Sequence, residues 1–324
     1  MWKSIAISLL VAAVAHAAEW QKIEVEEPHM GTIFRILVYT RHEQTARVAI
    51  AKAYTRVAEL DQKLSDYKVD SELNRLCRVG FQHPTQVSAE LFYVLDVAQK
   101  IAEQSNGAFD ISVGPLVRLW RQARQTKQLP SAEIVATSRA QTGFENIRLD
   151  RRHRLVTLLK PHMQIDLGGI AKGYTADQAF DVLKRAGLSK SLVAASGDIR
   201  VGDAPPGRRA WRVALDPFGK GSVENIELVN QAVSTSGATE QRIEIDGKRY
   251  SHILDPRSGL GLKTSHAVSA VARKGILADA WATAFCVLGP EAGRPFMARM
   301  PKIRIFFFDP GLANSASTAA KSKN

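Results

Sequence analysis

The sequence has only two cysteines among 324 residues, Cys77 and Cys286. A disulfide could form if the protein is exported from the cytoplasm, but a chain of this size has enough hydrophobic core to fold without one. Cys286 lies in an apolar run with helical spacing, where a free cysteine behaves as a small hydrophobic residue. We therefore expect neither a redox nor a metal-binding role for this pair.

Long apolar runs are also lacking. The run at residues 5–15 follows Lys3 and ends in an A-x-A pattern at residues 15–17, and it is too short to span a bilayer. These features predict a signal peptide at residues 1–17, with cleavage before Ala18. Because no cysteine lies near that site, nothing supports a lipid anchor. We expect an exported, periplasmic and soluble protein whose contact with membranes is at most peripheral.

Acidic residues are fewer than basic ones, 32 against 44, which gives a formal net charge of +12. A basic chain can favour nucleic acid, anionic lipid or anionic small ligands. Export removes access to nucleic acid and no recognition motif is present, so we expect no nucleic-acid partner. Four arginines, at positions 148, 151, 152 and 154, crowd one expected hairpin. A solvated basic face explains them more simply than a dedicated binding patch.

Internal repeats and breaks in composition are absent as well, so the sequence predicts one domain at residues 18–312 and a disordered, lysine-containing tail at 313–324. The spacing of its apolar residues indicates an α+β fold of mixed sheets with packed helices. Such a fold could form two lobes that meet at a cleft. Helices are expected at Glu43–Leu64, Ser88–Gln104, Ser131–Gln141, Ile170–Ala186 and Leu277–Leu288. Strands are expected at Gly31–Tyr39, Ile147–Leu149, Leu155–Leu159, Ser191–Ala195, Trp211–Leu215, Ile226–Leu228, Arg242–Ile245, Ala267–Ala272 and Ile303–Phe308.

The strongest motif is the run IDLGGIAKGY at residues 165–174. An apolar strand ends in Asp166, passes two glycines and opens a helix. Paired glycines let a backbone approach a ligand, and the free N–H groups of a helix start bind phosphate. Lys172 would oppose the helix dipole in the first turn, a conflict that a bound anion removes. A tight strand-to-helix turn with an exposed lysine explains the motif equally well.

Two further motifs carry groups suited to catalysis. Asp279 and Thr283 are four residues apart, so on a helix they share one face and offer hard oxygen ligands for Mg²⁺. A helix cap at Asp279 and a filler role for Thr283 would explain them as well. His252 ends a strand beside an Asp-Pro turn, where it fits either a general base or a hydrogen-bonded structural histidine.

Segments 107–116 and 233–237 combine β-formers, small polar residues and glycine, as a chain bordering a ligand would, although turns and core would explain them too. Taken in order, all these segments resemble the FAD:protein FMN transferase family, often labelled ApbE-like. The resemblance rests on residues 30–32, 64–67, 71–74, 109–116, 166–173, 234–237, 252–256 and 278–283.

The resemblance implies the ApbE-like flavin transferase fold, with FAD in a central cleft and Mg²⁺ beside its pyrophosphate. It implies transfer of FMN from FAD to a Ser or Thr hydroxyl through a phosphoester bond, with release of AMP. The acceptors would be flavoprotein subunits of exported or membrane redox complexes. It assigns His252 as catalytic base, and the metal ligands as Asp279, Thr283 and the Gly169 carbonyl. It assigns the flavin site to Met30, Tyr67, Ala108, Phe109, Asp110, Asp166, Lys172 and Leu254.

Some features depart from the commoner family pattern or leave alternatives open. Lys172 and Ala282 stand where some members carry acids, which leaves the number of metals at one or two. An Mg²⁺-dependent FAD pyrophosphatase and an exported flavin-binding protein remain alternative functions. Residues 236–239, Ser-Gly-Ala-Thr, resemble the acceptor motif of such enzymes, so slow self-flavinylation at Thr239 is a further hypothesis, with coincidence as its alternative.

Overall fold

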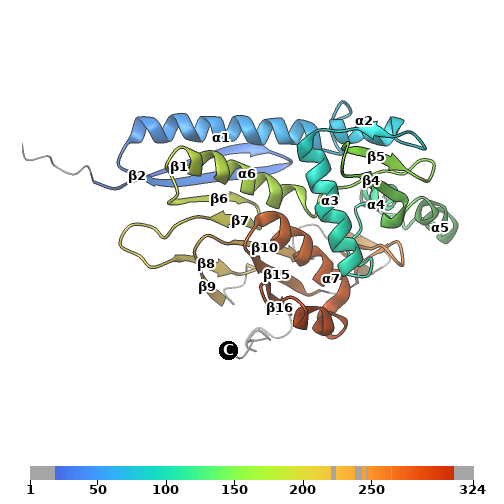
Figure 1. Cartoon of the computed structure of the whole chain (residues 1–324). Coiled ribbons are helices and arrows are strands. Elements are labelled where there is room, and N and C mark those ends of the chain that lie inside the picture. Colours follow the sequence, from blue (N-terminus) through green and yellow to red (C-terminus); the bar gives the residue numbers. More distant parts are fainter. Residues whose placement is uncertain (1–18, 220–223, 238–242, 246, 264, 310–324) are drawn as a thin grey trace, which may run out of the picture.

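The computed structural model describes residues 19–219, 224–237, 243–245, 247–263 and 265–309 (Figure 1). The predicted signal peptide, the predicted tail and Thr239 lie outside these residues. The helices are α1 (Glu43–Leu64), α2 (Glu72–Val79), α3 (Ala89–Gln104), α4 (Gly114–Thr126), α5 (Ala132–Ala140), α6 (Ala171–Arg185) and α7 (Gly275–Ala298). None of the described helices is both long and apolar enough to cross a membrane.

A seven-stranded sheet forms the larger lobe, with every neighbouring pair antiparallel. Its order is β1 (Gln21–His29), β2 (Thr32–Thr40), β6 (Ser191–Ala195), β7 (Asp198–Val201), β10 (Ala232–Gly237), β15 (Ala267–Ala272) and β16 (Arg304–Phe308). The hairpin turn between β1 and β2 is Met30-Gly31, and both residues have positive φ (50° and 70°), as the tightest hairpin turns require. This turn holds Met30 at one end of the sheet.

One face of the large sheet is covered by helices, and the other is covered in part by a hairpin. Helices α1, α6 and α7 lie over one face, where Ile36, Ala53 and Phe180 belong to a buried core (Figure 1). The hairpin of β8 (Trp211–Leu215) and β9 (Glu224–Leu228) packs on the other face, and Trp211 and Phe306 are buried there. The outer face of the β1–β2 hairpin stays exposed, at Ile33 and Arg35 for example, whereas the middle of the sheet is buried on both sides.

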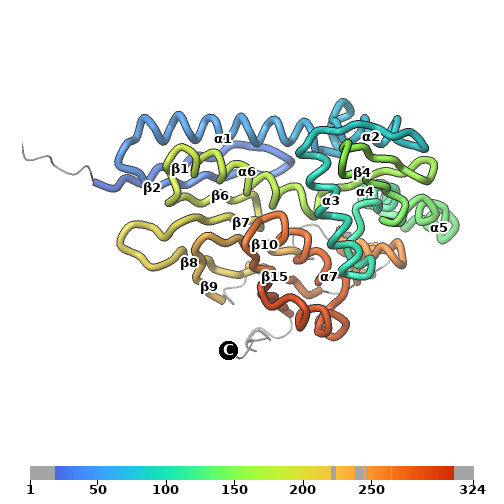
Figure 2. Tube along the Cα trace, viewed as in Figure 1, coloured from blue at the N-terminus to red at the C-terminus, as the bar shows by residue number. Residues whose placement is uncertain are grey.

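A smaller lobe contains α2 to α5 and a three-stranded sheet of β3 (Thr85–Gln86), β5 (Leu155–Leu158) and β4 (Ile147–Asp150) (Figure 2). One hydrophobic cluster joins this lobe to α7, with Leu91 and Leu95 of α3 and Trp281 and Phe285 of α7 fully buried. The remaining strands form hairpins, β11 (Ile243–Ile245) with β12 (Lys248–Tyr250) and β13 (Leu254–Asp255) with β14 (Leu260–Gly261). The α+β class is confirmed.

All but one of the predicted elements are present, most with ends shifted by one or two residues. Helix α3 begins where predicted, with the Ser88 hydroxyl accepting the N–H of Leu91 at 3.2 Å. Helix α7 is longer than predicted, because the chain continues through a non-helical Gly289 into a second helical segment. The elements that were not predicted are helices α2 and α4 and strands β1, β3, β7, β10, β13 and β14. The strand expected to end at Asp166 is wrong, because that segment forms only an isolated bridge at Gln164.

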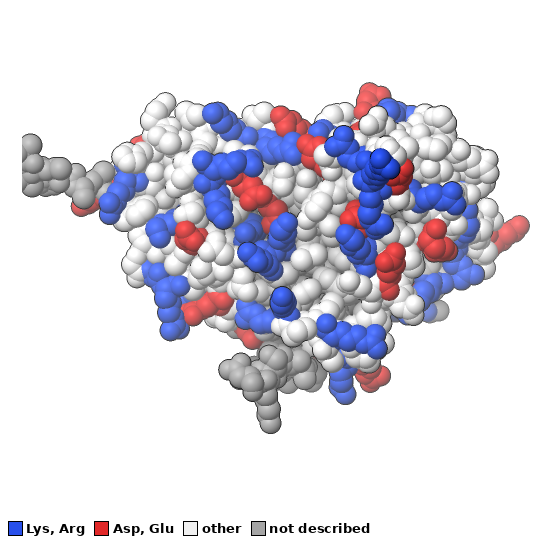
Figure 3. Space-filling view, in the orientation of Figure 1, with Lys and Arg blue, Asp and Glu red and all other residues white. Residues whose placement is uncertain are grey.

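The structure places Cys286 in the core, as expected, and leaves the arginines of the basic hairpin in solvent. Cys77 and Cys286 are buried and unbridged. The four arginines of the β4–β5 hairpin are exposed, and Arg151 pairs with Asp96 at 2.7 Å. On the face shown in Figure 3 cationic and anionic side chains are interspersed, as on an ordinary solvated surface.

Candidate active site

A cleft of about 1080 Å³ lies between the lobes. It is lined by strand ends and hairpin turns of the large sheet, by the first turn of α6, by Asp279 and Thr283 of α7, and by segments of the smaller lobe. All the residues that the sequence assigned to a site line this one cleft: Met30, Tyr67, Ala108, Phe109, Asp110, Asp166, Gly169, Lys172, His252, Leu254, Asp279 and Thr283. Their individual roles stay predictions, but residues more than two hundred positions apart in sequence share one cavity.

The glycine turn ahead of α6 is shaped by Asp166. Its Oδ1 accepts the N–H of Gly168 at 2.7 Å, and its backbone N–H donates to the carbonyl of Ile111 at 2.8 Å. A Cβ on Gly169 would lie 3.0 Å from Oγ1 of Thr283 and 3.3 Å from the Phe109 ring. Glycine at this position therefore lets the turn approach α7 closely, as the predicted metal site requires.

Helices α6 and α7 cross at two glycines. A Cβ on Gly173 would meet the carbonyl oxygen of Gly275, so only glycine permits this contact. The contact brings Asp279 to α6, where its Oδ2 accepts the N–H of Gly173 at 3.0 Å. Asp177 of α6 in turn caps α7, accepting the N–H groups of Gly275 and Ile276 at 2.8 and 3.1 Å. The cap on α7 is thus Asp177, and Asp279 is left facing the cleft.

Charge is concentrated where the two helices start. Lys172 Nζ lies 3.1 Å from Oδ2 of Asp198 and 4.0 Å from Oδ2 of Asp279, and it donates to the Gly168 carbonyl at 3.2 Å. Burial and the neighbouring Asp198 raise the pKa of Asp279 to about 7, against the lowering effect of Lys172. Burial alone would lower the pKa of Lys172, but Asp198 and Asp279 hold it above its ordinary value. The Lys172 ammonium is therefore shared by the carboxylates of Asp198 and Asp279, and the remaining negative charge would attract a second cation to this part of the cleft.

His252 enters the cleft just before β13. Its side chain is reached by the solvent of the cleft, but the surrounding walls, together with Lys172 and Arg124, lower its pKa to about 4. It is consequently a neutral imidazole at pH 7, able to accept a proton. A pKa this low makes the imidazole a weaker base than an ordinary histidine, so the role of His252 as base stays a prediction.

Asp110 is a cleft residue whose carboxylate is largely engaged by the protein. It accepts the N–H groups of Ser112 at 2.7 Å and Phe144 at 3.1 Å, and burial raises its pKa. Its structural task is to shape the Ala108–Phe109 segment beside the glycine turn. Any flavin contact at Asp110 remains a prediction.

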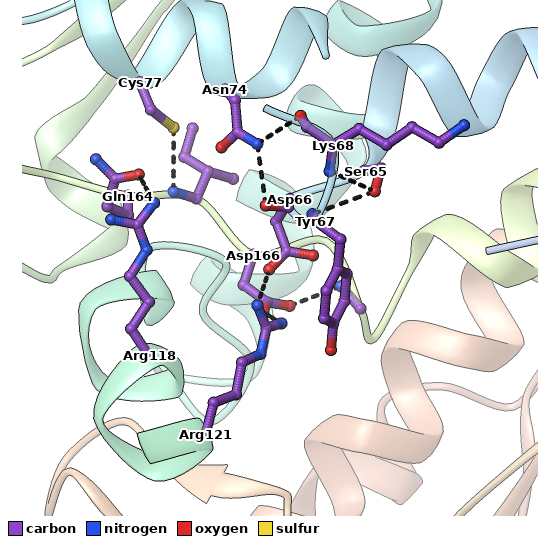
Figure 4. Close-up of polar contacts among 12 residues, drawn as sticks. Ser65, Asp66, Tyr67, Lys68, Asn74, Cys77, Arg118, Arg121, Gln164 and Asp166 are labelled. Atoms are coloured by element: carbon purple, nitrogen blue, oxygen red, sulfur yellow. Dashed lines mark hydrogen bonds and ion pairs between the residues drawn. The ribbon is translucent and has the colours of Figure 1, made fainter. Parts of the chain in front are cut away.

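Sequence reasoning missed two charged contributors. Asp198 begins β7 after a tight turn with Ser196 at φ 56°, and it accepts the hydroxyl of Ser234 at 2.5 Å. The small, polar Ser196-Gly197-Asp198 run was a usable turn signal. Arg121 of α4 reaches Asp66 and Asp166 and lies against Tyr67 (Figure 4). Nothing in the sequence pairs Arg121 with these residues, because α4 itself was not predicted.

The donor set at α7 suits a small hard cation. The Gly169 turn, the Thr283 hydroxyl and the Asp279 carboxylate are all oxygen donors, and the close approach of Gly169 to Thr283 brings two of the three together. Among the residues that the structure describes, no three His, Cys, Asp or Glu side chains cluster as metal ligands. A cation here would accordingly need oxygens from its substrate.

Comparisons with known proteins agree with this geometry. A family model described as the ApbE family matches residues 30–307. A FAD:protein FMN transferase of Escherichia coli is 31% identical, with 89% of this chain and 84% of that protein covered. One from Vibrio cholerae is 30% identical, with coverages of 98% and 97%. The crystal structure of the ApbE protein from Thermotoga maritima superposes with a TM-score of 0.84 at 28% identity, covering 93% of this chain and 97% of the other.

Proposed function

We propose that this chain, which belongs to the ApbE family, transfers FMN from FAD to a Ser or Thr hydroxyl of a target flavoprotein through a phosphoester bond and releases AMP. Family membership and flavin transfer by an enzyme rest on the family match, on the curated relatives and on a solved flavin transferase from Vibrio cholerae, with a TM-score of 0.83 and 28% identity. The bond type, the metal and the acceptor are the proposed parts.

The observation that carries the proposal is the meeting of three groups in one cleft. The glycine turn at 168–169 offers backbone groups, Asp279 and Thr283 offer hard oxygens, and His252 offers a neutral imidazole. A pyrophosphate needs anion-binding backbone and neutralising charge, whereas an incoming hydroxyl needs a proton acceptor. The cleft provides all of these within one cavity.

The reaction is a displacement at phosphorus. The acceptor hydroxyl oxygen forms a bond to the phosphorus on the FMN side of the pyrophosphate, and the bond from that phosphorus to the bridging oxygen breaks. AMP leaves with the bridging oxygen, and the hydroxyl proton passes to His252. The ammonium of Lys172 binds phosphate oxygens, while Tyr67 and Phe109 pack against the planar rings.

Mg²⁺ would be held by the Gly169 carbonyl, Asp279 and Thr283, and when bound it supplies charge neutralisation at the pyrophosphate. The raised pKa of Asp279 is consistent with such a site, since a buried carboxylate short of positive charge gains from a divalent ion.

The predicted compartment belongs to the proposal as well. A signal peptide at 1–17 and a transferase domain at 18–312 would place the enzyme in the periplasm as a soluble protein. Acceptors there would be flavoprotein subunits of exported or membrane redox complexes.

The test is incubation with FAD, Mg²⁺ and a purified candidate acceptor, followed by gel separation and chromatography. A transferase yields a fluorescent acceptor band and AMP. Free FMN with an unlabelled acceptor would instead indicate a pyrophosphatase, and unchanged FAD a flavin-binding protein. Either of these results would refute the proposal for that acceptor.

A further inference from the structure

A cluster of four residues stands at the mouth of the cleft (Figure 4). One nitrogen of the Arg121 guanidinium, Nη1, lies 2.5 Å from Oδ2 of Asp66, and the other, Nη2, lies 3.2 Å from Oδ2 of Asp166. The guanidinium carbon lies 4.0 Å from the centre of the Tyr67 ring. Arg121 is thus in contact with both sides of the cleft mouth and with its most exposed aromatic residue.

The turn that carries Tyr67 is held by hydrogen bonds. Ser65 Oγ accepts the N–H groups of Tyr67 and Lys68 at 3.2 and 3.3 Å. The Asn74 amide donates to the carbonyls of Asp66 and Lys68, both at 2.9 Å. The backbone of Tyr67 is therefore fixed, yet the residue is 77% exposed and belongs to none of the hydrophobic clusters among the described residues, so its ring needs another restraint. The contact with Arg121 supplies that restraint.

Arg121 is brought to this place by α4, which begins against the extended segment before Asp166, where Val113 and Gln164 form an isolated β-bridge. A Cβ on Gly114 would lie 2.5 Å from the Gln164 carbonyl oxygen, so the helix start touches that segment. Asp166 then uses one oxygen for the N–H of Gly168 and the other for Arg121. One carboxylate consequently links the glycine turn to the aromatic residue at the cleft mouth.

We propose that Arg121 is a positioning residue, which holds the Tyr67 ring as an aromatic wall for a planar ring of FAD and links this wall to the glycine turn. The proposal rests on the proposed function, because FAD is the ligand. The guanidinium covers one face of the Tyr67 ring and leaves the other for stacking. A planar group that binds two carboxylates while lying on a ring is specific to arginine; lysine offers only a point charge.

The experiment compares Arg121→Met with Arg118→Met. Arg118 lies one turn earlier on α4 and bonds Gln164 at 2.6 Å, but it does not line the cleft, so it controls for loss of an arginine from the same helix. FAD affinity is measured in EDTA and without acceptor, through quenching of flavin fluorescence. We expect Arg121→Met to bind FAD about tenfold more weakly, to raise KM for FAD by a similar factor and to change kcat by less than about threefold. Arg118→Met should match the wild type.

A second comparison tests whether Arg121 acts through the ring. In a Tyr67→Ala background, Arg121→Met should weaken FAD binding by less than about twofold, because the wall is already gone. Arg121→Lys should fall between wild type and Arg121→Met, and it replaces Arg121→Met if the latter does not fold. Equal FAD affinity in wild type and both Arg121 variants, or additive losses with Tyr67→Ala, would overturn this role alone. Failure of the wild type to bind FAD would overturn the proposed function and, with it, this role.

Discussion

Replacing Lys172 by Met should destabilise the fold by removing the cation shared by two buried carboxylates. The side chains of Asp198 and Asp279 are only 5% and 3% exposed, and Lys172 Nζ lies 3.1 and 4.0 Å from them. Removing one partner of a buried ion pair typically costs about 3–5 kcal/mol. Because a domain somewhat smaller than this one loses about 2–4 °C per kcal/mol, the expected fall in melting temperature is on the order of 10 °C.

The effect should depend on pH in a defined direction. The folded-state pKa of Asp279 is about 7, above its ordinary value near 3.8, so the cost of ionising it is absent at low pH and grows as pH rises toward 7. Without Lys172 this cost is larger. The difference between Lys172→Met and wild type should therefore be greatest at pH 8 and smaller at pH 5, where Asp279 is protonated.

Urea unfolding followed by circular dichroism measures this at both pH values, with Lys172→Arg as the charge-preserving control. The double variant Lys172→Met/Asp198→Asn should recover most of the lost free energy of unfolding at pH 8, because a single buried carboxylate then remains. A Lys172→Met protein within about 1 kcal/mol of wild type at pH 8, or a double variant no more stable than the single, would refute the reasoning.

Three further outcomes follow from the proposed metal site. Asp279→Ala should reduce FMN transfer at least about 100-fold while circular dichroism shows an intact fold, because a charged metal ligand contributes several kcal/mol to transition-state stabilisation. Near-normal transfer by this variant at limiting Mg²⁺ would rule out Asp279 as a metal ligand. EDTA should stop the reaction, Mg²⁺ should restore it and Ca²⁺ should restore it poorly, since a small octahedral ion suits a two-phosphate bridge; full activity in metal-free buffer would contradict this. Finally, the Mg²⁺ concentration for half-maximal activity should rise up to about tenfold per pH unit below 7 as Asp279 takes up a proton, and a flat profile between pH 5.5 and 8 would argue against Asp279 as a ligand.

The sequence predicted the fold where its periodicity was strong. Helix α1 has an unbroken apolar face over Glu43–Leu64, and its predicted bounds match the structure. Helix α4 begins with Gly114-Pro115 and carries arginines through its length, so its short apolar face was concealed. Strand β10 follows Ala232-Val233 with small polar residues and a glycine, and its pairing with β7 and β15 identifies it as a central strand.

The candidate site was predicted to the extent that local motifs carry it. The glycine turn and the Asp279/Thr283 pair are readable within a few residues, and both line the cleft. Asp198 and Arg121 could not be found in this way, because their partners lie far along the chain and are brought near only by the sheet order and the packing of α4. A single sequence does not encode those distances in any local pattern.

The central claim is that the enzyme transfers FMN from FAD to a protein hydroxyl and does not hydrolyse FAD to free FMN. The most direct measurement is the ratio of AMP released to FMN bound on a purified acceptor, from chromatography and intact-protein mass, with the acceptor's modified Ser or Thr replaced by Ala as control. The account predicts one AMP for each phosphoester-linked FMN, and no adduct on the control. AMP released in step with free FMN, with the acceptor mass unchanged, would contradict it.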